Sequence, residues 1–516
     1  MTDPLERFAW HPEPELIGYG DAASSRTALE RLGSDTWAAA LDFLYDHAAK
    51  RAMGDPAPYA ALRASFFGAT GGPAPAPASP TPIAVILDEF RDRLASGQMN
   101  AQHPRQFGYF TPPPLPVSIM GELLAQMTNQ GVDVWHAGPL ATFVEEEVVR
   151  WLCDLVGYGP GSFGLLTSGG VMANFMGMAL ARDIHLGRLL GAGRAPRGAM
   201  LDGVRVYTSD QTHFSIARAL DLLGFPPETL VVVESDERFR LQGRPVAEAV
   251  GRDRAAGMTP FAIAAVAGST NTGSVDLVGE LADVAAAEGL WLHVDAAYGG
   301  AARLSARDAG RVPDLDRADS VTVDPHKWFF QAYDIGGLLV RDSAHLAQVF
   351  GGRAPEYYRG GETAVGDDHD DGDQLNFYKL SFEGTRRWRA LKLWMSWKHL
   401  GTDGFGRLIE GNDDLAAHLA RRCAEADDFE AIPETPELSV VCFRHLPAGL
   451  DGAALDAHQD RLQRALEVSG EGWLTTTRLR NATWLRAGIV NYLTTEADVD
   501  RLLGTLRSLA VQGPER

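Results

Sequence analysis

Lysine is the scarcest charged residue in this chain of 516 residues. Lysine and arginine together number 47, and the lysines are only Lys50, Lys327, Lys379, Lys392 and Lys398. Arginine stays protonated in proteins, whereas lysine can lose its proton and form a Schiff base with a carbonyl compound. A lysine that this chain has kept is therefore a candidate for chemistry that arginine cannot perform.

Further features that the sequence lacks exclude several classes of protein. The three cysteines, Cys153, Cys423 and Cys442, have no metal-ligand spacing and no even number for disulfides, which suits a reducing compartment. No apolar run approaches a membrane span, and the start, MTDPLERFAWHPEPE, does not resemble a signal peptide. The net charge of −21 argues against nucleic acid and anionic membranes as partners. We therefore expect a cytoplasmic protein without a metal site.

Composition divides the chain into three parts. Residues 1–98 are expected to be a helical segment with a proline- and glycine-rich linker at residues 68–82. The stretches SSRTALERL and DTWAAALDFLYDHAA before the linker, and IAVILDEFRDRL after it, predict its helices. Residues 99–395 are expected to form a large domain. Residues 396–516 are expected to form a small α+β domain, with SVVCFR and TWLRAGIVN as strands and TTEADVDRLLGTL as the closing helix.

The middle of the chain predicts an α/β fold with a mostly parallel central sheet flanked by helices. Its apolar runs are FGLLT, RVYTS, TLVVVE, FAIAAVA, LWLHVD, SVTVD and GGLLVR, and they alternate with helical stretches. Because the runs are apolar throughout, we expect both faces of the sheet to be covered. Ligands bind such sheets beyond the carboxyl ends of the strands, and five runs are followed there by polar or glycine-rich groups.

Four features at these strand ends fit one cofactor. SGGVMAN, residues 168–174, opens a helix and can cradle a phosphate. Asp295 can hold a protonated ring nitrogen, His213 can stack on a flat ring, and Lys327 of VDPHKWFF can form a Schiff base. Each feature alone has a structural explanation: a turn, a helix cap, a core histidine or a surface lysine. Together they predict pyridoxal 5′-phosphate.

The motifs SDQTHFS, HVDAAYGG and DPHKW resemble the group II pyridoxal-phosphate-dependent decarboxylases, the aromatic-L-amino-acid and glutamate decarboxylase family. HPRQFGYF (103–110) and RRWRALKLW (386–394) are similar as well, and the resemblance runs from about residue 85 to the C-terminus. It implies the fold-type I transferase fold and decarboxylation of an L-amino acid to an amine and CO₂. It also implies a homodimer with active sites at the subunit interface and an N-terminal segment that wraps the partner.

The resemblance further implies roles for single residues. Lys327 is expected to be the Schiff-base lysine, and Asp295 the partner of the pyridine nitrogen. Ala297 and His213 are expected on the two faces of the ring. The remaining cofactor contacts are expected from Gly169, Gly170, Val171 and His326 at the phosphate, and from Thr270 near the cofactor hydroxyl or the substrate carboxylate.

A loop after the sheet, GGRAPEYYRGG, is expected from the resemblance to carry a tyrosine that protonates the substrate Cα across the dimer interface. The Pro-x-Tyr pattern favours Tyr357, with Tyr358 as the second choice, and a solvated loop without a role is the structural explanation. A tyrosine here favours decarboxylation over aldehyde synthesis. Transamination and a catalytically silent interaction protein also stay open, and the presence of Lys327 argues against the silent protein.

The candidate residues of the substrate side-chain pocket are Phe107, Tyr109, Phe110, Asp133, Trp135 and Thr385. Their aromatic members favour an aromatic amino acid. Asp133 and Thr385 depart from the aromatic decarboxylases, which carry a phenylalanine and a small residue at these places. Tyrosine, glutamate and diamino acids therefore stay open as substrates.

Overall fold

The computed structural model describes residues 6–18, 23–45, 51–68, 71–192, 195–352 and 374–512. The chain divides into two compact units. The first consists of Met1–Gln106, Asp460–Leu474 and Ala497–Arg516, and the second of Phe107–Gln459 and Thr475–Glu496. The domain boundaries after residues 98 and 395 stay predictions.

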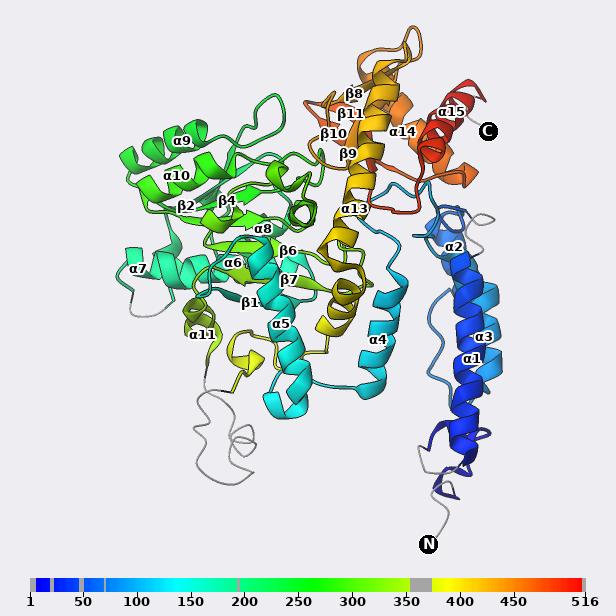
Figure 1. The fold of residues 1–516 in the computed structure, drawn as a ribbon. Coiled ribbons are helices and arrows are strands. Elements are labelled where there is room, and N and C mark those ends of the chain that lie inside the picture. The colour runs from blue at the N-terminus through cyan, green and yellow to red at the C-terminus, as the bar shows by residue number, and fades with distance from the viewer. Residues whose placement is uncertain are drawn as a thin grey trace, which may run out of the picture. The chain divides into compact units, whose positions relative to one another are not determined.

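The N-terminal part of the first unit is helical, as its amphipathic stretches predict (Figure 1). Its α-helices are α1 (Ala23–Tyr45), α2 (Tyr59–Phe67) and α3 (Ile83–Glu89). The described parts of the two stretches predicted before the linker, up to Tyr45, form one continuous helix through Gly33, because a glycine costs a helix only about 1 kcal/mol. Residues 71–82 of the linker form neither helix nor strand, as their proline content predicts.

The second unit is built on a seven-stranded sheet whose strands coincide with the seven predicted apolar runs. The strand order is β1-β7-β6-β5-β4-β2-β3. β7 pairs antiparallel with β1 and β6, and the remaining pairs are parallel, so the sheet is mostly parallel. The strands are β1 (Phe163–Thr167), β2 (Val204–Ser209), β3 (Leu230–Val233), β4 (Thr259–Val266), β5 (Trp291–Asp295), β6 (Ser320–Val323) and β7 (Gly336–Val340).

Helices cover both faces of this sheet, which explains why the strands are apolar throughout (Figure 1). In β4, Ala262 and Ala264 belong to one buried cluster, while Ile263 and Ala265 belong to the other. The first cluster includes residues of α6 (Gly170–Leu180) and α8 (Ser215–Leu222). The second includes residues of α5 (Pro139–Leu155), α9 (Gly243–Ala255) and α10 (Val278–Glu288).

A smaller antiparallel sheet follows, in the order β10-β11-β9-β8. Its strands are β8 (Phe429–Ile432), β9 (Val440–His445), β10 (Thr475–Leu479) and β11 (Ala482–Gly488). β9 and β11 match the predicted strands, whereas the edge strands β8 and β10 were not predicted. The remaining α-helices are α4 (Pro116–Thr128), α7 (Gly187–Leu189), α11 (Ala344–Phe350), α13 (Ala390–Ala424), α14 (Gly452–Ser469) and α15 (Glu496–Gln512). Over the described ranges, no helix has the length and apolar character that a bilayer span requires.

Candidate active site

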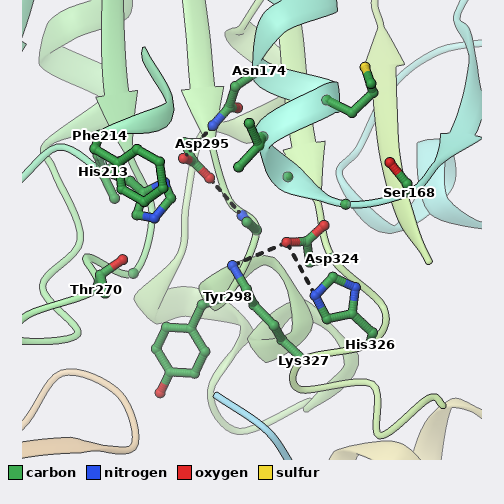
Figure 2. Close-up of a pocket in the computed structure, with 17 residues that line it drawn as sticks. Ser168, Asn174, His213, Phe214, Thr270, Asp295, Tyr298, Asp324, His326 and Lys327 are labelled. Carbon is green, nitrogen blue, oxygen red and sulfur yellow. Dashed lines mark hydrogen bonds and ion pairs between the residues drawn. The ribbon is translucent and has the colours of Figure 1, made fainter. Parts of the chain in front are cut away.

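A cavity of about 400 Å³ lies beyond the carboxyl ends of β1, β2, β4, β5 and β6. Figure 2 shows side chains from several of these strand ends pointing into one space. Its lining residues are Ser168, Gly169, Gly170, Val171, Met172, Asn174, His213, Phe214, Val266, Gly268, Thr270, Asp295, Ala297, Tyr298, Asp324, His326 and Lys327. All nine cofactor-binding candidates from the sequence are in this lining.

The glycines after β1 keep one wall of the cavity free of side chains. Gly169 has a φ of 154°, a backbone conformation that favours glycine. A Cβ on Gly170 would lie 2.8 Å from Asp324 Oδ2, so a larger residue there would force the Asp324 carboxylate to move. α6 begins at Gly170, and its first turn presents main-chain N–H groups and the positive end of the helix dipole. This wall can therefore hold an anion.

Lys327 meets a carboxylate in the cavity. Its Nζ lies 3.1 Å from Asp324 Oδ2, and its side chain is 23% exposed. Burial lowers the pKa of Lys327, but the negative charges of Asp324 and Asp295 outweigh it, so the net pKa is raised. The aromatic residues that follow in the sequence, Trp328 and Phe329, are buried in the core. The aromatic residues next to Lys327 in the sequence therefore pack behind the lysine.

Asp295 ends β5 and is 6% exposed. Its Oδ2 accepts a hydrogen bond from Asn174 Nδ2 at 2.7 Å, and its Oδ1 accepts one from the main-chain N–H of Ala297 at 3.1 Å. Figure 2 shows the carboxylate across the cavity from Lys327. A buried carboxylate held by two N–H donors can pair with a protonated ring nitrogen.

The two histidines of the cavity differ in their partners. His213 Nδ1 lies 2.8 Å from Ser215 Oγ, and burial lowers the pKa of His213. His326 Nδ1 lies 2.7 Å from the carbonyl oxygen of Ile335, and burial lowers the pKa of His326 as well. Because a carbonyl only accepts, His326 carries its proton on Nδ1. Both rings can therefore bind a cofactor in the neutral form.

Arg486 is a buried cation that the sequence analysis did not single out. It is 4% exposed, its Nε donates to the carbonyl oxygen of Thr270 at 2.7 Å, and its guanidinium lies 4.7 Å from the centre of the Phe110 ring. Burial lowers its pKa, and its Nη2 has no hydrogen-bond partner among the described residues. The sequence contains one indication of this role: Arg486 lies inside the apolar stretch TWLRAGIV, and burying a charge in a strand is costly unless the charge is paired.

Asp324 and Asn174 were not predicted as site residues either, although Asp324 lies in VDPHKWFF and Asn174 in SGGVMAN. Asp324 stands three residues before Lys327 and forms its ion pair. Within the described part of the chain, its Oδ1 is buried without a hydrogen-bond partner. One partner of Asn174 is Asp295, 121 residues further along the chain. No local pattern indicates such a distant contact.

The six substrate-pocket candidates do not line the described part of the cavity. Phe110 stacks on Tyr298 with ring centroids 4.0 Å apart, and Phe107 is fully buried. Tyr109 and Thr385 are exposed, whereas Asp133 and Trp135 are half-buried. Their roles stay predictions. Tyr357 and Tyr358 lie outside the described residues.

The residues present fit pyridoxal phosphate. The glycine wall would hold its phosphate, Lys327 its aldehyde carbon and Asp295 its ring nitrogen. Among the described residues, no group of three metal-ligating side chains competes with this assignment. The fold and this donor set define a fold-type I pyridoxal-phosphate enzyme.

Comparisons with known proteins agree with this class. Residues 69–446 match the family described as "Pyridoxal-dependent decarboxylase conserved domain". The chain is 34% identical over 427 residues to an aromatic-L-amino-acid decarboxylase of Bacillus atrophaeus, covering 82% of this chain and 85% of that protein. It is 32% identical over 436 residues to an L-2,4-diaminobutyrate decarboxylase of Rhizobium meliloti, covering 84% of each. A crystal structure of Oryza sativa TDC with PLP and tryptamine aligns with a TM-score of 0.84 at 25% identity, over 96% of this chain and 99% of that one.

The chain therefore belongs to the pyridoxal-dependent decarboxylase family, and it is a pyridoxal-phosphate-dependent amino acid decarboxylase. This confirms the predicted family, fold, cofactor and reaction class.

Proposed function

We propose that this enzyme decarboxylates aromatic L-amino acids to the corresponding amines and CO₂. The observation that supports this choice is the apolar side of the cavity. Phe214 and Val171 line the cavity, and they are 52% and 39% exposed in the single chain. Exposed apolar side chains in the lining that also contains Lys327 favour a flat apolar substrate side chain. The similarity to the Bacillus atrophaeus enzyme points the same way.

The cofactor would be held by the residues of the lining. Lys327 is the proposed attachment residue, Asp295 the partner of the pyridine nitrogen, and Ala297 and His213 the contacts on the two ring faces. Gly169, Gly170, Val171 and His326 are proposed for the phosphate, and Thr270 for the hydroxyl or the substrate carboxylate. Bound pyridoxal phosphate supplies an electron sink for the electron pair that the departing carboxylate leaves behind.

The protein's own groups would orient the substrate and return a proton. Arg486 Nη2 is unpaired among the described residues and the side chain lies against Thr270, so we propose that these two residues bind the substrate carboxylate. A planar guanidinium suits a carboxylate, and the buried position excludes water from the pair. Tyr357, with Tyr358 as the second choice, or a relay through His213, would deliver the proton to the substrate Cα.

The test is CO₂ release from a panel of the twenty amino acids and 2,4-diaminobutyrate. We expect release from tryptophan, tyrosine or phenylalanine. Release only from glutamate or a diamino acid would overturn the aromatic assignment, and the Rhizobium meliloti relative makes the diamino acid the second candidate. Formation of an aldehyde or a keto acid in place of the amine would replace decarboxylation by oxidation or transamination.

We also propose that the enzyme is a homodimer. Large apolar side chains are exposed on two helices that pack against α13: Leu123, Leu124 and Met127 on α4, and Leu140 and Phe143 on α5. A second copy would cover such surface. Light scattering at micromolar concentration tests this proposal, and a mass of 55.7 kDa in solution would refute it.

The cytoplasm remains the proposed location, and the three cysteines are buried and free. Cell fractionation would test it, because recovery of the enzyme outside the cytoplasmic fraction would contradict the proposal.

A further inference from the structure

Behind the cavity lies a line of hydrogen bonds that the proposed function does not use. It begins at Trp291 and Ser320 and passes through His293 and Asn174 to Asp295. These side chains are all buried, and His293 and Ser320 are completely inaccessible to solvent. Neither of the two lines the described part of the cavity.

The donors in this line determine where His293 carries its proton. Trp291 Nε1 can only donate, and it donates to Ser320 Oγ at 3.1 Å. The hydroxyl proton of Ser320 is therefore available to His293 Nδ1, 2.8 Å away. Burial lowers the pKa of His293 to about 4, so the ring is neutral near pH 7 and its proton sits on Nε2. This Nε2–H donates to Asn174 Oδ1 at 2.9 Å.

Asn174 can then adopt only one orientation. Its Oδ1 accepts from His293 and from the Thr322 hydroxyl at 2.7 Å. Its Nδ2 donates to Asp295 Oδ2 at 2.7 Å and to Ser215 Oγ at 2.8 Å. A flipped amide would place its oxygen against the carboxylate and its NH₂ group against two donors.

The same amide controls the other side of the cavity. Because Ser215 Oγ accepts from Asn174, its own proton is directed to His213 Nδ1, 2.8 Å away. The main-chain N–H of Ser215 points at the same nitrogen from 3.4 Å. Two donors at Nδ1 leave Nε2 as the protonated nitrogen of His213.

Helix α6 has room for this histidine only because of a glycine. A Cβ on Gly177, three residues after Asn174, would lie 2.6 Å from His293 Cε1 and 2.8 Å from Nδ1. Any larger residue at position 177 would displace the ring from the amide. The close approach of α6 to β5 thus places His293 against Asn174.

We propose that His293 is a positioning residue of this active site, which holds the Asn174 amide in one orientation so that Asp295 keeps its N–H donor and His213 keeps its proton on Nε2. This inference rests on the roles proposed above for Asp295 and His213. His293 acts on both of them through the Asn174 amide, to which its Nε2–H donates.

The test compares two substitutions of similar size. His293→Leu removes the donor, and His293→Gln restores an N–H near the place of Nε2. Apoprotein is titrated with pyridoxal phosphate, and binding is followed by absorbance. We expect His293→Leu to raise the dissociation constant of the cofactor by about tenfold to a hundredfold. His293→Gln should bring it back to within about threefold of the wild-type value. The kcat for the substrate should follow the same order, with KM changing less.

A second pair keeps the test decisive if His293→Leu does not fold. Thr322→Val removes the other donor to Asn174 Oδ1 at nearly constant shape, and Thr322→Ser keeps it. The valine variant should weaken cofactor binding, and the serine variant should not. Equal dissociation constants within both pairs would overturn the proposal. A wild-type protein that takes up no pyridoxal phosphate would instead refute the roles of Asp295 and His213.

Discussion

Two cavities of the second unit show how a reactive site differs from a cavity that is merely lined by charged residues. The larger cavity, about 620 Å³, is lined by Arg238, Arg240 and Arg311 among others, with Glu437 beside them. The smaller one, about 400 Å³, contains Lys327. Its size and its three arginines alone would suggest an anion-binding site, but Asp276, Glu280, Asp314 and Glu437 line the larger cavity too, and the family motifs surround the smaller cavity.

The difference lies in hydrogen-bonding capacity that is still available. In the larger cavity the charges bind one another: Arg238 pairs with Glu437 at 3.2 Å, and Arg240 pairs with Asp236 at 2.8 Å. In the described ranges, two polar atoms at the smaller cavity are buried without partners: Oδ1 of the lining residue Asp324, and Nη2 of Arg486, whose Nε donates to the lining residue Thr270. Buried polar groups are normally satisfied, so unpaired ones beside a cavity mark a place where a ligand completes the set.

The largest expected effect comes from replacing Lys327 in the smaller cavity, with the replacement of Arg238 in the larger cavity as the comparison. Lys327→Ala should lower kcat/KM by at least about a thousandfold, because alanine has no amine that could bind the cofactor covalently. The visible absorbance of the cofactor should change with it. Arg238→Ala, in the larger cavity, should leave both the spectrum and the rate at wild-type values. Equal losses in the two variants would show that the comparison is wrong.

Asp295→Asn should cause the next largest loss. The amide keeps the shape but lacks the charge that stabilises a protonated ring nitrogen, so we expect kcat to fall by about a hundredfold or more. Asp236→Asn is the matched control, since Asp236 pairs with Arg240 at the larger cavity. Steady-state kinetics at saturating cofactor separate the two. A fully active Asp295→Asn enzyme would remove Asp295 from the proposed site.

Arg486→Lys tests the unpaired donor. Lysine retains the charge but not the planar fork, so KM for the amino acid should rise by about tenfold to a hundredfold, with a smaller change in kcat. Arg478→Lys is the control, because Arg478 lies on the neighbouring strand β10 and is exposed. An unchanged KM in Arg486→Lys would show that its Nη2 does not bind the substrate.

The smallest expected effect is on stability, and the two cavities should differ in its sign. Burial lowers the pKa of His293, behind the smaller cavity, to about 4, from about 6.5 in an unfolded chain. The unfolded state therefore binds more protons between these values, and stability is lost as pH falls from 6.5 to 4, by up to about 3 kcal/mol. Burial raises the pKa of Asp276, at the larger cavity, to about 7, so its contribution is lost as pH rises from about 4 to 7.

Denaturant unfolding at several pH values checks both signs. His293→Gln should reduce the loss of stability toward pH 4, and Asp276→Asn should reduce the loss toward pH 7. A wild-type-like pH dependence in His293→Gln would mean that the ring is not held neutral in the folded protein.

Much of the fold followed from local patterns. The seven strands of the large sheet are continuous apolar runs, because helices bury both of their faces, and each run was visible by itself. The edge strands β8 and β10 were not predicted from the sequence. TTTRL in β10 is mostly polar, and an edge strand has one neighbour and more contact with solvent.

The candidate site divides in the same way. Lys327, Asp295 and His213 could be found because each lies at or just after the end of an apolar run, and parallel strands bring their carboxyl ends to one edge. The order of the strands in the sheet, the ion pair between Lys327 and Asp324, and the approach of Arg486 to Thr270 could not be found this way.

Which residues carry chemistry can be read from the amino-acid sequence, since amine, carboxylate and imidazole are properties of single side chains. Which partners these side chains contact depends on the folded chain. Asn174 and His293 are 119 residues apart, and they meet because α6 packs closely against β5 with a glycine at the point of contact. Such contacts depend on the packing of whole elements, so the charge state and tautomer of the site are decided by the fold.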